Sequence, residues 1–547
     1  MQRAASILQP PTPNPSSPKG MTLKRLILSV LTLFVAILVG GSLWSSFQEP
    51  QITNRLQLYQ TNLLLHAATS TEATGGENGA SMQKALLGDA PLKTALEQYQ
   101  TVRKGAEGDL EKLETRLAAI APAGTVDRSA ATSDAAPSRP IPSRTVDSQA
   151  TRLTTAIQQQ RSLIDQLDLS IGILQAEQGD LAAAQQTWSK LAAGAGADNP
   201  AADTARTLTG LWNEPPRLVP DADMQIQKGL EGWFRYVALA RLYGLQQRTE
   251  ALNALRADEA AIAQGTLFKL ALVGTVPVLG AIAGAGLLIF LIAQRLTQGK
   301  QSILALNGDA PWEVPWNWEI IWQVLIVGFF IAGQVVAPLI VGVLSPGLAA
   351  FGPRSKAIYA FTYYLLMAGS GLAVLYWSIR KWFPLPKDWF QYRVADRWPL
   401  WGLGGYLVAL PLMIGVSLVN QQIWQGQGGS NPLLQIVLEE GDALSLGLFL
   451  FTAAVAAPIF EETLFRGFLL PSLTRYVPVW GAIALSSLLF AVAHLSLSEV
   501  APLTTLGAVL GIVYTRSRNL LAPILLHSLW NAITMIGLFV LGSGARL

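Results

Sequence analysis

Long apolar runs recur along this chain, separated by polar segments. A helix that crosses the hydrocarbon core of a membrane needs roughly 20 apolar residues. Most of the runs reach about that length, and the run beginning at Pro502 is the shortest. The pattern predicts about nine helices, near Leu26–Trp44, Phe268–Ala293, Ile320–Leu344, Ala357–Ser378, Leu400–Val419, Leu444–Phe468, Trp480–Leu497, Pro502–Thr515 and Leu520–Leu541. The expected fold class is therefore all-α, a polytopic transmembrane helical bundle with an α-helical extramembrane domain.

The segment 48–264 has a different pattern. It is rich in Gln, Ala, Leu and Glu, its apolar residues recur with helical periodicity, and it has no window long enough to span a membrane. Two helical blocks, 52–119 and 148–264, flank Ala121–Ser148, whose composition is typical of a flexible linker. This segment is predicted to be a separate helical domain, for which a protein partner is expected.

Within the second block, four residues have the spacing of one tetratricopeptide repeat: Gly172, Gly179, Ala184 and Trp188. In such repeats small residues allow close helix contact, and an alanine and a tryptophan interlock between paired helices. Arrays of this kind need about three repeats to be stable. An ordinary helical hairpin is therefore the favoured interpretation, and a tetratricopeptide-like domain is the alternative.

The N-terminal region combines a polar tail with one apolar run. Residues 1–20 are rich in Pro and Ser, which predicts a disordered tail. Lys24 and Arg25 precede a run of about 19 residues, longer than the roughly 7–15 of a cleaved signal peptide. Residues 21–47 are therefore predicted to be an uncleaved signal anchor with the N-terminus in the cytoplasm.

The flanking charges are consistent with that orientation. Basic residues follow the C-terminal end of every even-numbered predicted helix, as expected when those ends face the cytoplasm. Only Arg354 and Lys356 depart from this pattern. The 48–264 domain then lies outside the cytoplasm. The expected location is a bacterial inner membrane or a related membrane, with lipid around the bundle. The basic exits are Arg295, Lys300, Arg380, Lys381, Lys387, Arg393, Arg466, Arg475, Arg516 and Arg518.

Composition narrows the chemistry. Charged residues make up only 14% of the 547 residues, and the formal net charge is +3, too small to indicate a nucleic-acid partner. The chain has no cysteine, which excludes disulfides and thiolate metal sites. A metal would need His, Asp, Glu or Asn ligands, and two of the three histidines lie in the last 55 residues.

The sixth predicted helix contains adjacent carboxylates. Inserting an ionisable side chain into a membrane helix costs about 2.5–3.5 kcal/mol on insertion scales. Each such side chain is therefore expected to have an interaction partner or a functional role. Glu462 and Arg466 are four residues apart and can form an ion pair on one helix face. Glu461 points about 100° away from Glu462 and has no such local partner. Glu461 is therefore the better candidate for a general base.

The seventh and ninth predicted helices contain the other candidate groups. Phe490 and His494 lie one helical turn apart, and so do His527 and Asn531. An imidazole and a carboxamide on one helix face, opposite a carboxylate on another helix, can hold and polarise a water molecule. Each residue alone could serve helix–helix hydrogen bonding; the combination favours a catalytic site within the membrane.

This combination resembles the CAAX prenyl endopeptidase and bacteriocin-processing family of intramembrane proteases, known as CPBP or Abi. Its members share EExxxR, FxxxH and HxxxN on successive helices. The resemblance covers about residues 400–541, so 400–547 would be the protease core, and 265–399 would hold helices two to four. The motifs are complete and in order here, as Glu461, Glu462, Arg466, Phe490, His494, His527 and Asn531.

The resemblance implies an intramembrane endopeptidase acting on a membrane-associated or hydrophobic peptide. In that family the first Glu and first His activate water, which here implies Glu461 and His494. The second His and the Asn stabilise the oxyanion, which implies His527 and Asn531. Glu461, His494 and His527 could instead bind zinc, but we expect a metal-free site without a cofactor. The alternative functions are a non-catalytic membrane scaffold or maturation or immunity factor, and, less favoured, a transporter.

Overall fold

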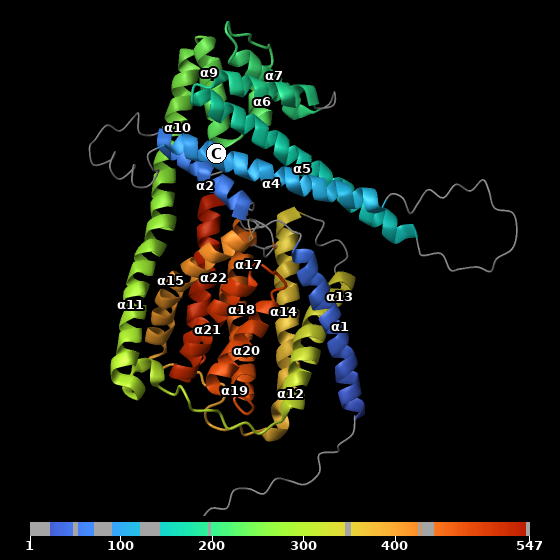
Figure 1. Ribbon diagram of the computed structural model, residues 1–547, viewed down its shortest axis with the longest axis vertical. Helices are drawn as coiled ribbons and strands as arrows, with labels where there is room; N and C mark the ends of the chain where they lie inside the picture. Colours follow the sequence, from blue (N-terminus) through green and yellow to red (C-terminus); the bar gives the residue numbers. More distant parts are fainter. Residues whose placement is uncertain are drawn as a thin grey trace, which may run out of the picture.

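The computed structural model is entirely helical in the part that it describes, with no strand there. A bundle of long helices lies beneath a second group of helices that covers one of its ends (Figure 1). The predicted tail 1–20 and most of the predicted linker 121–148 fall outside the described part. Helix α5 begins at Ser143, so the last six residues of that predicted linker are helical; none of them is Pro or Gly. The described residues are 22–47, 53–69, 90–120, 143–194, 199–344, 352–424, 428 and 442–542.

The bundle contains a helix at each of the nine predicted positions. Seven helical stretches are long and apolar enough to cross a membrane in the described part of the chain, which confirms a helical membrane bundle. The other two are α20 and α21. The helices are α1 (Leu23–Ser46), α11 (Val276–Gln298), α12 (Trp318–Gln323) continuing through η6 (Val324–Val336) into α13 (Ala337–Leu344), α14 (Gly352–Ile379), α15 (Trp398–Trp424), α17 (Ala443–Phe451) continuing to α19 (Leu470–Leu473), α20 (Val479–Val492), α21 (Val500–Ser517) and α22 (Leu521–Gly542).

Helix α20 is shorter than its predicted span. The prediction extended this helix to Leu497, whereas it ends at Val492. The chain turns because Leu495 adopts a left-handed backbone conformation with φ of 58°, which an α-helix cannot include. The residues beyond the turn are still apolar, so the end is invisible to a hydropathy pattern. A count of nine spans stays a prediction.

The second group of helices has its own core, in which Trp188 and Trp212 are almost fully buried. Helices α5 and α6 form the predicted hairpin: Gly179 turns the chain with φ of 86°, and the backbone of Gly172 lies against the Trp188 indole. Membership of a tetratricopeptide family stays a prediction. These helices are α2 (Thr53–Thr69), α4 (Pro91–Ile120), α5 (Ser143–Glu177), α6 (Leu181–Gly194), α7 (Pro200–Leu211), α8 (Ala222–Gly229), α9 (Gly232–Leu245) and α10 (Thr249–Leu270).

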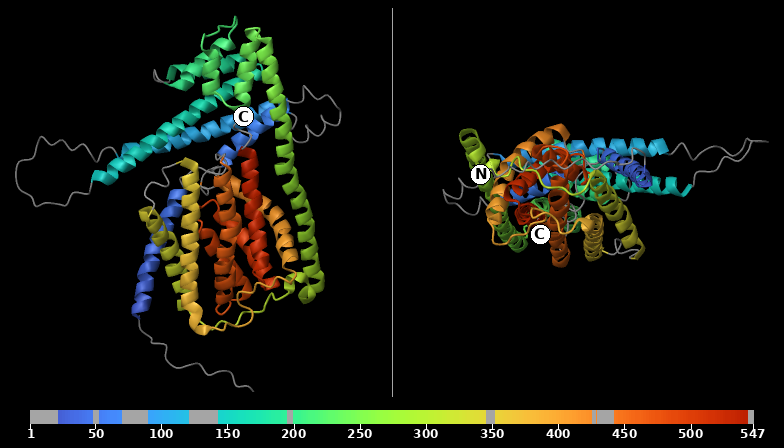
Figure 2. Two further views of the ribbon diagram at one scale, coloured as in Figure 1. Left: turned by 180° about the vertical axis from the view of Figure 1, so that it is seen from behind. Right: turned by 90° about the horizontal axis from the view of Figure 1, so that it is seen from below.

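Two features join this domain to the bundle. Helices α10 and α11 form one continuous helical stretch, Thr249–Gln301, of 53 residues (Figures 1 and 2). At 1.5 Å per residue it is about 80 Å long, enough to cross both the domain and a membrane. In addition, Tyr59 of α2 packs against a cluster at the end of the bundle, formed by Ala357, Phe449, Met535 and Leu538.

The basic residues that follow the even-numbered helices lie together at the opposite end of the bundle. The connection between α11 and α12, residues 299–317, accepts hydrogen bonds on its backbone carbonyls from Arg475, Arg516 and Arg518. The even-numbered exits at α11, α19 and α21 therefore meet at one end, as the charge pattern requires. Which side of a membrane that end faces remains the prediction made above.

Candidate functional site

The helix that carries both glutamates is locally widened. Residues Thr452–Ala456 (η9) form a π-helical turn, in which the N–H of Ala457 bonds to the carbonyl of Thr452. The carbonyl of Ala453 would next pair with residue 458, but that residue is proline and has no N–H. Asn531 of α22 takes the vacant position: its Nδ2 donates to the Ala453 carbonyl over 2.7 Å. Single π-turns of this kind often occur at functional sites.

A buried ion pair lies one turn further on, within a second π-helical segment, η10 (Glu462–Leu469). Arg466 donates through Nη1 to Glu462 Oε1 over 2.8 Å, and both side chains are fully buried. Arg466 also donates to the Gly507 carbonyl over 3.1 Å, and its guanidinium lies 4.5 Å from the centre of the Phe490 ring. The pair predicted from the i,i+4 spacing is therefore present, and it also ties α20 and α21 to the glutamate helix.

His527 stands between the two glutamates. Its Nδ1 lies 2.9 Å from Glu462 Oε1. An ionised carboxylate only accepts, so Nδ1 must carry a hydrogen and donate it. Its Nε2 lies 4.0 Å from Glu461 Oε2, too far for a direct hydrogen bond but close enough for one water to bridge them. Glu462 thus has a second role that its sequence position did not indicate, which is to orient the imidazole.

Glu461 is held by a residue that sequence reasoning missed. The hydroxyl of Tyr364, on α14, donates to Glu461 Oε1 over 3.0 Å. The other oxygen, Oε2, is buried without a hydrogen-bond partner among the described residues. A buried carboxylate oxygen without a partner is costly, so this position calls for a ligand such as water or a substrate group. One tyrosine in an apolar helix gives no local signal of such a contact.

His494 lies beside this group, in the turn that follows α20 rather than inside a longer helix. Its Nδ1 is 2.8 Å from the Phe490 carbonyl and therefore donates to it, which leaves Nε2 free to accept. The Phe490 ring makes edge contacts with both imidazoles, at 4.9 Å from His494 and 5.8 Å from His527 between ring centres. Six of the seven residues singled out in the sequence are thus connected through direct contacts. The seventh, Asn531, bonds to the Ala453 carbonyl instead.

A zinc site was the alternative use of Glu461, His494 and His527. No group of three or more His, Asp or Glu side chains is placed to hold a metal ion within the described ranges. Glu462 holds Nδ1 of His527, a contact that carboxylates also make to metal-bound imidazoles, so this bond does not decide between the two uses. A metal-free site stays a prediction, and no step below depends on a metal.

Comparison with known proteins identifies this region. Residues 443–533 match the family model "Type II CAAX prenyl endopeptidase Rce1-like". The chain is similar to the membrane-embedded CAAX protease MroQ of Staphylococcus aureus, with 28% identity over 25% of this chain and 56% of the relative. It is also similar to the putative membrane peptidase YdiL of Bacillus subtilis, with 25% identity over 25% of this chain and 55% of the relative.

An uncharacterised 24.3 kDa protein of Escherichia coli shares 29% identity over 33% of this chain and 88% of its own length. The chain spans only about half the length of the first two relatives. No solved structure matches the chain. The matched segment contains the two glutamates, both C-terminal histidines and the asparagine, whereas Tyr364, which bonds to Glu461, lies outside it.

Proposed function

We propose that this protein is an intramembrane endopeptidase, because residues 443–533 match the model of the Rce1-like CAAX endopeptidase family. It hydrolyses a peptide bond of a membrane-associated or hydrophobic substrate. Glu461 and His494 activate the attacking water, and His527 and Asn531 stabilise the oxyanion. Glu462, Arg466, Tyr364 and Phe490 position these groups.

The observation that carries the proposal is the buried, unpartnered Oε2 of Glu461, which faces Nε2 of His527 across 4.0 Å. A general base needs a free lone pair within reach of the proton that it removes. The Glu461 side chain is 14% exposed, whereas that of Glu462 is fully buried. Oε2 of Glu462 also lacks a hydrogen-bond partner among the described residues, so it is the greater exposure of its side chain that favours Glu461 as the base.

The proposed reaction uses these groups in turn. Glu461 removes a proton from water, and His494 Nε2 accepts the second hydrogen of that water as a hydrogen bond, so that the oxygen attacks the carbonyl carbon. A new C–O bond forms, and the carbonyl oxygen becomes an oxyanion. Glu461 then passes its proton to the amide nitrogen as the C–N bond breaks, which releases an amine and a carboxylic acid and restores the ionised base. The acid then loses its proton to the amine, which gives a carboxylate and an ammonium group.

The oxyanion requires donors on the other side of the carbonyl. Glu462 accepts the Nδ1 hydrogen of His527, which fixes the ring, and in the proposed step the imidazole donates to the oxyanion through Nε2. One Nδ2 hydrogen of Asn531 is used by the Ala453 carbonyl, which fixes the amide and leaves its second hydrogen available. Preorganised donors of this kind contribute about 2.7–4 kcal/mol each to related reactions.

The test is a comparison of new N-termini in membranes. Cells that lack the protein would receive the wild type or Glu461→Gln, which keeps the shape of the side chain but removes its basicity. The matched control is Glu313→Gln, an exposed glutamate in the α11–α12 connection. We expect N-termini that depend on the protein in wild type and in Glu313→Gln, and their loss in Glu461→Gln.

A non-catalytic scaffold gives a different outcome. It would leave the set of membrane N-termini identical in all three strains while the protein accumulates to the same level. That result would refute the proposed hydrolysis.

A further inference from the structure

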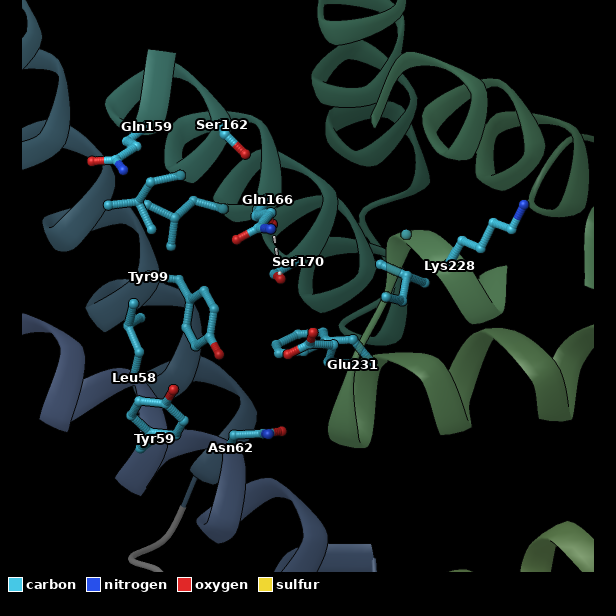
Figure 3. A pocket seen from close by; sticks show the side chains of 15 residues that line it. Leu58, Tyr59, Asn62, Tyr99, Gln159, Ser162, Gln166, Ser170, Lys228 and Glu231 are labelled. Atoms are coloured by element: carbon cyan, nitrogen blue, oxygen red, sulfur yellow. Dashed lines mark hydrogen bonds between the residues drawn. The ribbon is translucent and has the colours of Figure 1, made fainter. Parts of the chain in front are cut away.

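The helical domain contains a cavity that the proposed catalysis does not use. It has a volume of about 620 Å³ and lies between α2, α4, α5 and the connection from α8 to α9 (Figure 3). Cavities of about 300–1,000 Å³ are typical of ligand sites. The cavity is far from Glu461 in the fold, because it belongs to the domain that covers the end of the bundle.

One face of α5 supplies a polar row along this cavity. Gln159, Ser162, Gln166 and Ser170 follow one another at three- and four-residue spacing, so they lie on the same side of the helix. The amides of Gln159 and Gln166 have no hydrogen-bond partner in the parts of the chain that the structure describes, and neither does the hydroxyl of Ser162. Such groups both donate and accept, as a peptide backbone does.

Tyr99 of α4 adds a buried polar group. Its residue is only 6% exposed, and Figure 3 shows its hydroxyl pointing into the cavity. That hydroxyl makes no hydrogen bond to the described residues. It faces the open space of the cavity, where a ligand can reach it. Burial raises the pKa of the Tyr99 hydroxyl, which keeps it protonated and able to donate. A polar group kept free on a buried ring indicates a ligand.

The charge of the lining limits what that ligand can be. Lys228 and Glu231 are the only ionisable side chains there apart from tyrosines, and their formal charges cancel. The lining of the cavity therefore has no net charge that would attract a phosphate or a metal ion. Leu58, Leu163 and Phe234 supply apolar surface beside the polar row. A neutral ligand with alternating amide and apolar groups fits both walls.

An extended peptide has this alternation. Side chains of an extended strand that face the same way are separated by about 6.6–6.8 Å, and successive turns of α5 are separated by about 5.4 Å. Backbone amides of two or three extended residues can thus meet Ser162, Gln166 and Ser170 in turn. The side chains between them would lie on the leucine and phenylalanine surface.

The position of the cavity connects it to the membrane. Tyr59 lines the cavity and also packs against the bundle cluster that includes Met535 and Leu538 of α22. The same helix carries Asn531 and His527, about one and two turns from Met535 toward the middle of the bundle. Tyr59 thus links the wall of the cavity to the helix that carries the proposed oxyanion donors.

We propose that this cavity binds an extended, uncharged peptide segment, the extramembrane stretch of the substrate that flanks its membrane-embedded part. This inference rests on the proposed endopeptidase function for the identity of the peptide, whereas binding itself does not require cleavage. Hydrogen bonds come from Tyr99 and the polar row of α5.

The experiment uses the full chain, purified into lipid nanodiscs. The probe is a pool of random uncharged octapeptides with blocked ends, each carrying one photoreactive leucine. After illumination, mass spectrometry locates the adducts and gives their yield. The variants are Tyr99→Phe, which removes one oxygen, and Gln166→Leu. The matched control is Gln158→Leu, an exposed glutamine on the same helix that does not line the cavity.

We expect adducts on α2, α4, α5 and α9 around the cavity. Loss of one hydrogen bond should reduce their yield about 3- to 10-fold in Tyr99→Phe and in Gln166→Leu, with no change in Gln158→Leu. Adducts spread evenly over the protein would overturn the inference, and so would equal yields in all variants. Displacement of the peptides by maltohexaose at lower concentration than by unlabelled octapeptides would assign the cavity to carbohydrate and would also overturn it.

Failure of this inference and failure of the proposed function give different results. If membrane N-termini depend on Glu461 but no adduct forms at the cavity, the protease stands and the peptide site does not. If adducts form at the cavity and depend on Tyr99 while no N-terminus depends on Glu461, peptide binding stands and hydrolysis does not.

Discussion

The buried pair of Glu462 and Arg466 gives the sharpest quantitative prediction. Glu462→Gln leaves the guanidinium without its counter-charge, although the new amide oxygen can still accept from His527 Nδ1. Arg466→Gln leaves a buried carboxylate and also removes the bond to the Gly507 carbonyl and the contact with the Phe490 ring. Both single changes should destabilise the protein, and the change at Arg466 should cost more.

The magnitudes follow from the geometry. Removing one partner of a buried ion pair costs about 3–5 kcal/mol, because an uncompensated charge remains. Arg466→Gln adds about 0.5–1.5 kcal/mol for the lost carbonyl bond and about 1–2 kcal/mol for the lost ring contact. The double variant buries two neutral amides instead of one charge. We therefore expect it to be at least about 3 kcal/mol less destabilised than the sum of the single variants.

The assay is equilibrium unfolding of the purified protein in mixed micelles of increasing SDS content, followed by tryptophan fluorescence. The control cycle uses Asp203 and Arg206, an exposed pair three residues apart on α7. Exposed pairs of this kind are worth about 0.2–0.5 kcal/mol, so that cycle should be nearly additive. Additivity in both cycles would refute the reasoning, since it would mean that Glu462 and Arg466 do not interact.

Further predictions concern topology, catalysis and metal. Reporter fusions at Ala150 and Gly299 should report opposite sides of the membrane, and a common side would contradict the orientation drawn from the basic exits. His494→Ala should lower cleavage of a model peptide by about 10²-fold or more, as expected for a group that activates water, and wild-type turnover would exclude that role. Tyr364→Phe should lower it roughly 10- to 150-fold, since one hydrogen bond to a charged group is worth about 1.5–3 kcal/mol; turnover equal to wild type would show that Glu461 needs no such support. Activity should survive a chelator that strips zinc from a control enzyme, and full inhibition reversed by zinc would overturn the metal-free mechanism.

The sequence predicted the parts of this site that depend on local spacing. The Glu462–Arg466 pair was foreseeable because i,i+4 neighbours share a helix face. The contact between Glu462 and His527 was not, because 65 residues separate them and only tertiary packing brings them together. Tyr364 was missed for the same reason, since α14 is distant in sequence and a tyrosine is common in apolar helices.

The bundle was foreseeable to a similar degree. Long apolar runs predicted a helix at each of the nine positions, because lipid allows few other structures. The predicted end of α20 was wrong, because a hydropathy pattern contains no information about the backbone turn at Leu495. The π-turn before Pro458 was also invisible, although the proline that leaves the Ala453 carbonyl without an N–H is plain in the sequence.

That vacant carbonyl bears on how the site is assembled. Asn531 must pair with it, and Asn531 lies one turn from His527 on α22. The proline of the glutamate helix therefore fixes the rotation of α22, and with it the direction in which His527 Nε2 points. Glu462 fixes the other ring nitrogen of the same imidazole. Two contacts from one irregular helix thus set the position of the imidazole against Glu461, which is why the glutamates, the proline and the asparagine form one structural unit and not four separate features.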